Sequence, residues 1–188
     1  MIFISHAWIN NKPDEKVLQL VSTLRMLGYE ACCDDIVMEE RNSINFKRMM
    51  AENMQKSDKV IVILSNQYKL KADSFTGGVG AEYQYILGDI DKKVEKYILA
   101  TFENFNMLNT ITPDFLRNRQ VIFLETEGIR KLLYKIENIP EHKYPDINPI
   151  KTKLVSKDIP VLSDVFINER YTAEHPTLEL LSTTSIDI

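Results

Sequence analysis

The sequence contains little cysteine, histidine, glycine or tryptophan, and it lacks a long hydrophobic run. Its 188 residues include two cysteines, three histidines, six glycines and one tryptophan. No apolar run approaches the roughly 20 residues that cross a bilayer, and residues 2–4 follow Met1 without the basic start of a signal peptide. Cys32 and Cys33 are adjacent, which strains a mutual disulfide and supplies no zinc site without further ligands. We therefore expect a cytoplasmic protein with reduced thiols and no bound metal.

An excess of positive charge is also missing. The chain has 23 Lys and Arg against 27 Asp and Glu, a formal net charge of -4. Such a charge balance does not attract a polyphosphate backbone, which argues against nucleic acid as the main partner. Hydrophobic residues, at 44%, reach the usual fraction of globular proteins. A folded domain of about 140 residues with an extension is therefore expected.

Five short apolar segments are predicted to be strands of one sheet. They comprise residues 2–4, 29–33, 59–64, 97–102 and 120–124. Within the third segment, residues 60–64 are five consecutive branched aliphatic residues. This pattern is typical of the central strand of a parallel sheet, which is buried on both faces.

Helices are predicted between these strands, because apolar residues recur there at intervals of three and four. They cover residues 14–28, 43–53, 79–90 and 129–136. Asp14 and Ser43 can cap the first two helices. Residues 36–42 lack a clear period and are predicted to form a loop, and the stretch after Ser65 is predicted to be a polar connection. Strands alternating with helices imply a doubly wound α/β domain, with a five-stranded parallel sheet and helices on both faces.

The last 50 residues differ in composition from the rest of the chain. They contain no glycine and five of the seven prolines, namely Pro140, Pro145, Pro149, Pro160 and Pro176. Proline removes backbone donors and favours extended chain. We predict a domain over residues 1–138 and a linker or accessory segment over residues 139–188.

Polar side chains follow the first three predicted strands. In open α/β sheets, ligands bind in the crevice at the carboxyl ends of the strands. The residues delivered to this edge are Ser5, His6 and Trp8, then Asp34 and Asp35, then Ser65 and Tyr68. They supply an aromatic surface, hydroxyls and acids, so a ligand site is predicted there.

Each of these candidates also has a purely structural interpretation. Glu82 lies at the margin of the apolar stripe of its helix, where it can face the crevice or be a solvated residue near the positive helix end. The glycines at 77, 78 and 80 can form a phosphate nest, but they match neither the dinucleotide fingerprint nor the phosphate-binding loop. Trp8 can cover the sheet edge, and His6 can be a structural hydrogen-bonding group.

Four segments together resemble a TIR domain and, more narrowly, its bacterial SEFIR-like branch. They are residues 2–8 (IFISHAW), 24–30 (LRMLGYE), 57–65 (SDKVIVILS) and 77–82 (GGVGAE). The resemblance covers about residues 1–138 in order and leaves the last segment outside.

The resemblance implies a flavodoxin-like domain that either assembles with copies of itself for signalling or cleaves nicotinamide from NAD+. In the catalytic members one glutamate on the third helix is essential, and Glu82 occupies the matching position. Many of them place a tryptophan four residues earlier, where this chain has Gly78, as in the SEFIR-like pattern. Residues 35–42, with Asp35, Glu39 and Arg41, correspond to the family's assembly loop, which can complete a neighbour's pocket.

One carboxylate suffices for this chemistry. In NAD+ the nicotinamide ring is a cationic pyridinium, and it leaves the ribose as a neutral base. No general acid is therefore needed, and a single anion can stabilise the positive ribosyl centre. We expect Glu82 to supply that anion. Ring stacking is expected from Trp8 or Tyr68, and binding of ribose or phosphate-linked groups from Ser5, His6, Asp34 and Ser65.

The function implied is an NAD+ glycohydrolase that is activated by self-assembly, in bacterial antiphage defence, with NAD+ as substrate and no cofactor. Two other functions stay open: a non-catalytic module for signalling assembly, and a flavin- or phosphate-binding protein. For the flavin- or phosphate-binding function, the sequence lacks the phosphate-binding loop expected after the first strand. Whether the product is linear or cyclic ADP-ribose, and whether residues 139–188 lead to a nucleotide-sensing domain, also stays open.

Overall fold

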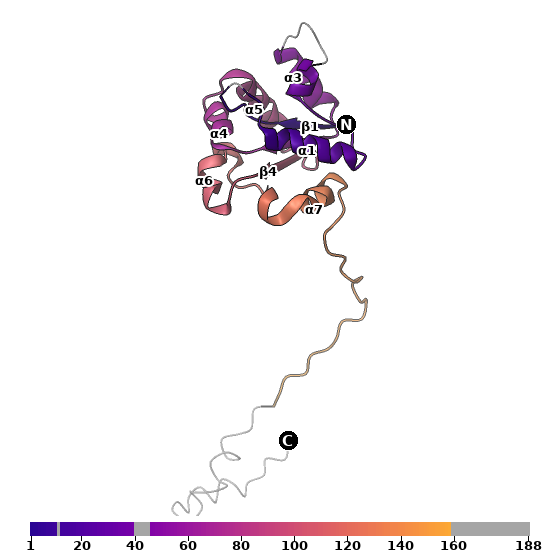
Figure 1. The fold of residues 1–188 in the computed structure, drawn as a ribbon. Coiled ribbons are helices and arrows are strands. Elements are labelled where there is room, and N and C mark those ends of the chain that lie inside the picture. Colours follow the sequence, from indigo (N-terminus) through magenta and orange to yellow (C-terminus); the bar gives the residue numbers. More distant parts are fainter. Residues whose placement is uncertain (11, 40–45, 159–188) are drawn as a thin grey trace, which may run out of the picture. The chain divides into compact units, whose positions relative to one another are not determined.

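The structure, a computed structural model, describes residues 1–10, 12–39 and 46–158 and confirms the doubly wound α/β architecture (Figure 1). Five parallel strands form one sheet in the order β2-β1-β3-β4-β5. They are β1 (Ile2–Ser5), β2 (Ala31–Cys33), β3 (Lys59–Ile63), β4 (Tyr97–Thr101) and β5 (Val121–Phe123). This is the flavodoxin-like order, and the strand predicted to be central, β3, has two neighbours on each side.

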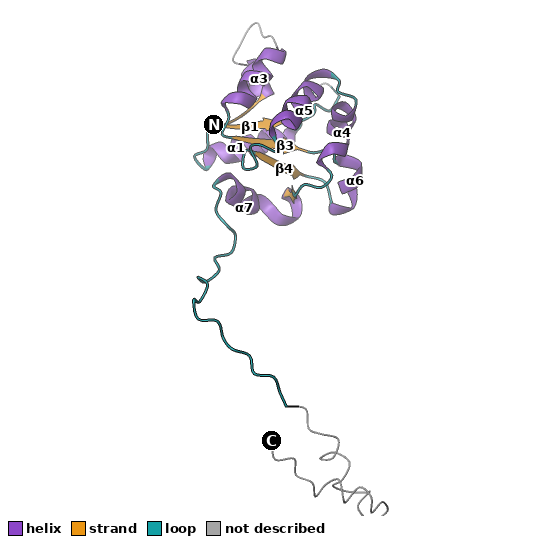
Figure 2. Ribbon diagram, turned by 180° about the vertical axis from the view of Figure 1, so that it is seen from behind, coloured by secondary structure: helices purple, strands orange, loops and turns teal. Residues whose placement is uncertain are grey.

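Helices cover both faces of the sheet, and each face has its own hydrophobic core. One core contains side chains of α3 (Phe46–Lys56), α4 (Asn66–Asp73) and α5 (Gly77–Asp89), and the other those of α1 (Glu15–Met26) and α7 (Leu124–Ile136) (Figure 2). In β3, Val60 and Val62 join the first core, and Ile61 and Ile63 the second. Each such side chain contributes about 1.5–3 kcal/mol when fully buried.

The first helix begins and ends as its sequence predicts. The backbone N–H of Lys16 donates to the side chain of Asp14 at 3.0 Å, which caps α1. Gly28 follows the helix with a positive φ of 91°, which glycine adopts at little cost. The buried face consists of Val17, Leu20, Val21 and Leu24.

The prediction of a loop over residues 36–42 was wrong for residues 36–39. A six-residue helix, α2 (Asp34–Glu39), follows β2 directly. Asp34 and Asp35 lie in its first turn, where negative charge is favoured by the helix dipole, and Val37 packs into a core. Residues 40–42 and Ser43, the predicted cap of the next helix, lie outside the described residues.

The polar connection predicted after Ser65 is also a helix. Ser65 caps α4, because its Oγ accepts a hydrogen bond from the backbone N–H of Tyr68 at 3.1 Å. Only Tyr68 and Ala72 are buried in this helix, so its apolar stripe is too sparse to appear as a period. Between β4 and β5 lie three short elements, η1 (Phe105–Met107), α6 (Leu108–Ile111) and η2 (Asp114–Leu116).

The end of the domain is marked by α7, which is interrupted at Gly128 with φ 70°. The chain forms two units, Met1–Lys143 and Tyr144–Ile188. The assignment of residues 139–188 to a linker or accessory segment stays a prediction. Among the described residues, helices of the length and apolar character required to span a bilayer are not found.

The glycine run is part of α5 and crosses a backbone segment closely. Its three glycines belong to the first turns of this helix. A Cβ on Gly80 would lie 2.2 Å from the carbonyl carbon of Phe75, a residue that itself has a positive φ of 52°. The bend between α4 and α5 is therefore too tight for a side chain at position 80. It places Glu82, two residues later, against the sheet.

Replacing Gly80 by alanine is expected to destabilise the domain. The obstructing atoms belong to the backbone of Phe75 and cannot turn away as the end of a side chain can. Overpacking of this kind costs about 1–3 kcal/mol. The free energy of unfolding, measured by urea titration, should fall by that amount.

Gly88→Ala is the matched control, because Gly88 lies in the same helix and a Cβ there would meet nothing within 4 Å. Alanine in place of a helical glycine stabilises by roughly 0.5–1 kcal/mol. The two substitutions should thus have opposite signs, and two equal effects would contradict the close approach at Gly80.

Candidate functional site

The carboxylate of Glu82 is buried at the carboxyl end of β1. Its side chain is only 2% exposed, and the hydroxyl of Ser5 donates a hydrogen bond to Oε2. Oε1 has no hydrogen-bond partner among the residues that the structure describes. Burial raises the pKa of Glu82 to about 8, the Ser5 hydrogen bond lowers it, and the charge of Asp34 adds to the increase. The interpretation of Glu82 as a solvated residue near a helix end is therefore wrong.

Ser5 and Tyr68 stand behind this carboxylate in the core. Both are buried, and the Ser5 Oγ and the Tyr68 phenol oxygen are 3.4 Å apart. Burial, with the nearby charge of Glu82, raises the pKa of Tyr68 far above its usual range. Because the Tyr68 side chain is 0% exposed, it cannot stack on a ligand as predicted. Its position suits holding Ser5 in place.

A second polar cluster connects the end of β1 with the start of α2. His6 Nδ1 lies 3.4 Å from Asp34 Oδ1, and His6 Nε2 lies 3.3 Å from Asp35 Oδ2. The indole Nε1 of Trp8 donates a hydrogen bond to the other oxygen of Asp34, Oδ2, at 2.9 Å. Burial raises the pKa of Asp34, although His6 and this hydrogen bond act in the opposite direction.

Glu82 and the polar cluster around His6 lie at the same pocket, which has a volume of about 360 Å³. Glu82, His6, Trp8 and Asp34 all contribute to its wall. Its volume lies near the lower end of the range for small-molecule sites, about 300–1,000 Å³. Four of the predicted site residues are thus brought together beside one cavity, at the β1/β3 edge where the chain direction across the sheet reverses.

Four other predicted residues do not appear in the wall of this pocket, and one of them, Arg41, lies outside the described residues. Ser65 does not line this pocket and instead caps α4. Asp35, predicted both at the sheet edge and in the assembly loop, is 6% exposed and faces His6, because the helix in place of the loop turns it inward. Glu39 ends α2.

Among the charged residues of the pocket wall, one was absent from the predicted site residues. Lys71 of α4 lines the cavity, and its Nζ donates to the backbone oxygen of Trp8 at 3.3 Å. It places a cationic side chain beside Glu82 and Asp34 at the pocket wall. Lys71 was missed because α4 was not predicted, and this helix directs the Lys71 side chain toward Trp8.

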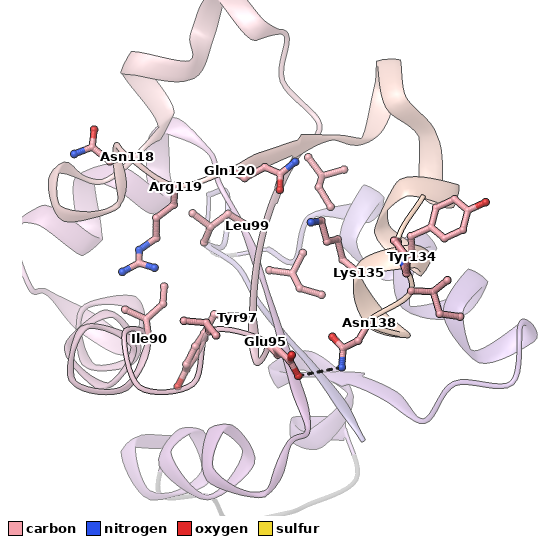
Figure 3. Close-up of a pocket in the computed structure, with 15 residues that line it drawn as sticks. Ile90, Glu95, Tyr97, Leu99, Asn118, Arg119, Gln120, Tyr134, Lys135 and Asn138 are labelled. Atoms are coloured by element: carbon pink, nitrogen blue, oxygen red, sulfur yellow. Dashed lines mark hydrogen bonds between the residues drawn. The ribbon is translucent and has the colours of Figure 1, made fainter. Parts of the chain in front are cut away.

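A larger cavity of about 580 Å³ lies at the amino ends of β4 and β5 (Figure 3). Arg119 stands on one side of it, and Tyr134 and Lys135 of α7 stand on the other. The Arg119 guanidinium pairs with Asp91, and Asn138 donates to Glu95 at 3.4 Å. It contains none of the predicted site residues, and the smaller pocket, with its buried acids, is the better candidate for chemistry.

Comparison with known proteins finds a family match over most of the chain. The family model described as "TIR domain" matches residues 2–133. Among solved structures, one described as a prokaryotic SEFIR domain is 26% identical, with a TM-score of 0.56, and the match covers 80% of this chain and 98% of that chain. No curated protein matches the chain. The region of the family model includes every predicted site residue from Ser5 to Glu82.

Glu82→Gln is expected to make stability less dependent on pH. The Glu82 carboxyl has its ordinary pKa of 4.5 when unfolded and about 8 when buried. Between these values the unfolded chain has released the proton and the folded chain keeps it, so the stability of the wild type falls as pH rises. Glutamine has no such proton. The stability difference should grow in favour of the variant across this window, by on the order of a few kcal/mol.

Urea titrations of both proteins at several pH values measure this difference. The neighbouring groups Asp34, His6, Tyr68 and Lys71 are present in both proteins, so the comparison isolates residue 82. Glu103→Gln, which replaces an exposed glutamate, is the matched control and should not reproduce the difference seen with Glu82→Gln. A stability difference that stays constant with pH would show that residue 82 does not bury an acid.

Proposed function

The chain belongs to the TIR domain family, and we propose that it cleaves the bond between nicotinamide and ribose in NAD+, with Glu82 as the catalytic carboxylate. The observation that carries the proposal is the position of Glu82. It lines a pocket, is held by Ser5 through one oxygen, and has its other oxygen without a partner in the described structure. A free, buried carboxylate oxygen at a pocket wall is suited to a substrate that becomes cationic.

The reaction balances without a general acid. As the bond from C1′ of the ribose to the pyridinium nitrogen breaks, its electron pair goes to that nitrogen, and nicotinamide leaves as a neutral molecule. Water then adds to C1′ and loses a proton, which gives ADP-ribose. The positive charge that develops on the ribose lies best beside an anion in a site with little water. Glu82 supplies that anion, and Ser5 keeps it oriented.

The protonation state of Glu82 links the reaction to pH. Only the ionised carboxylate stabilises a cation, and burial raises the pKa of Glu82 to about 8. Below this pH most of the free protein carries a neutral acid at the site. A bound cationic nicotinamide ring favours the ionised form and lowers this pKa, so catalysis extends below it.

The pocket suits one end of the dinucleotide. A volume of about 360 Å³ is small for a complete dinucleotide, so we assign it to the nicotinamide riboside end. Trp8 is half-buried at the wall and can stack on the ring, while Asp34 can bind ribose hydroxyls. The remainder of the substrate then lies outside the pocket, where a second copy of the chain can cover it. Activation by self-assembly, in bacterial antiphage defence, follows the family resemblance.

Glu82→Gln is expected to lower the rate of NAD+ cleavage by roughly a thousandfold, since about 4 kcal/mol of transition-state stabilisation is lost. The shape of the side chain is kept, so the protein should stay folded by circular dichroism. Release of nicotinamide from NAD+, followed by chromatography at high protein concentration, measures the effect.

Glu103→Gln serves as the matched control and should retain the wild-type rate, because Glu103 is exposed and remote from the pocket. Cleavage by Glu82→Gln at the wild-type rate would remove Glu82 from the mechanism.

A non-catalytic interaction module is the second candidate function. It is favoured by the likeness to a prokaryotic SEFIR domain and by Gly78, which stands where many catalytic members of the family have tryptophan. In this case Glu82 is structural, and the region after α2 mediates self-association.

The two functions differ in what a charge reversal at Arg41 does. Arg41→Glu is expected to abolish concentration-dependent assembly in light scattering, and Arg25→Glu, on the exposed side of α1, should preserve it. In the enzyme, NAD+ cleavage is lost together with assembly. In the interaction module, assembly is lost while NAD+ stays intact with every protein at every concentration.

A further inference from the structure

We propose that His6, Asp34 and Asp35 form a binding site for a divalent transition-metal ion beside the Glu82 pocket. One ligand atom from each of the three side chains lies within 4.8 Å of the others. His6 follows β1, and the two acids open α2, so the end of one strand and the start of one helix form the site. The proposal does not depend on NAD+ cleavage.

The spacing of the three side chains is close to that between ligands of one ion. Carboxylate oxygens and imidazole nitrogens bind such metals at about 2.0–2.2 Å, which places neighbouring ligand atoms about 3–4 Å apart. The two His6 nitrogens lie 3.4 and 3.3 Å from oxygens of Asp34 and Asp35. An ion binds only one of these nitrogens, so the carboxylate that faces the other nitrogen has to turn toward the ion. The three ligand atoms already lie within 4.8 Å of one another.

The missing hydrogen bonds of His6 point to a ligand. Its side chain is buried, with the residue only 4% exposed, and neither ring nitrogen makes a hydrogen bond within the described residues. A neutral imidazole has one N–H, whereas both of its nitrogens here face carboxylates, which only accept. At least one lone pair of a neutral His6 thus opposes a carboxylate oxygen. A cation between them removes that repulsion.

Hydrogen bonds from neighbouring groups orient Asp34 and Asp35, as is usual for carboxylates that bind metals. The Trp8 indole donates to Asp34 Oδ2, and the backbone N–H of Asp35 donates at 3.1 Å to Asp34 Oδ1, the oxygen that faces His6. The Cys33 thiol donates to Asp35 Oδ2 at 3.9 Å. Such outer hydrogen bonds orient ligating carboxylates. Asp34, Asp35 and Glu82 bring three buried or half-buried carboxyl groups close together, and a dication lowers the cost of their negative charge.

One imidazole with two carboxylates is a ligand set for zinc or cobalt, because calcium and magnesium prefer oxygen alone. The sequence predicted no metal, since the one histidine and two acids are separated by the whole of α1 and β2. A protonated His6 held between the two acids is the metal-free alternative, and the test separates the two states.

Trp8 provides a reporter, because it is the only tryptophan in the chain and its indole is bonded to Asp34. After treatment with a chelator, the full chain is titrated with Co²⁺, which quenches nearby indole emission and has visible absorption when bound by protein ligands. We expect saturable quenching with one Co²⁺ per chain, reversed by Zn²⁺. Quenching without saturation, or a visible spectrum equal to that of aqueous Co²⁺, would overturn the site.

Variants locate the ion. Asp35→Asn and His6→Gln should each weaken Co²⁺ binding by roughly tenfold or more. The matched control replaces His142 and His175 together by glutamine, which leaves His6 as the sole histidine and should preserve binding. Binding lost in the control but kept in the His6 variant would assign the metal to the end of the chain and refute the proposal. If a variant does not fold, the control protein alone decides, through its stoichiometry and visible spectrum.

Discussion

The hydrogen bond from Ser5 to Glu82 joins the end of the first strand to α5, and the geometry of the candidate site depends on it. Without a donor at this point, an acid that is only 2% exposed would lie in the core with neither oxygen satisfied. Tyr68 stands behind Ser5, 3.4 Å away, so three elements meet at one carboxylate. Two hydrophobic cores, one on each face of the sheet, hold those elements at the spacing that this contact requires.

The buried carboxyl of Glu82 therefore lowers the stability of the folded protein. A buried carboxyl whose pKa rises to about 8 is a liability for the folded state at neutral and alkaline pH. Proteins retain such groups mostly where chemistry or binding uses them. The His6 cluster adds a second concentration of charge at the same pocket. Acids gathered there suit a cationic ligand, whether a pyridinium ring, a developing ribosyl cation or a metal ion.

Sequence reasoning reached the sheet, the long helices and the central strand, because periodicity of apolar residues reports burial directly. It missed α2 and α4, which are short or bury only two residues, and whose polar composition resembles a connection. Glu82 was identified by the family resemblance and by its place at the margin of a helix stripe. The contacts among Ser5, Tyr68 and Glu82, and the inward turn of Asp35, depend on rotamers and on α2, which spacing along the chain does not encode.

The close crossing of Gly80 over Phe75 also constrains how far related sequences can diverge. A chain that bends in this way needs a residue without a side chain two positions before the acid. The three-residue frame Gly-x-Glu, residues 80–82, then becomes a register mark within the helix. An alignment anchored on that glycine would locate the equivalent carboxylate in distant relatives.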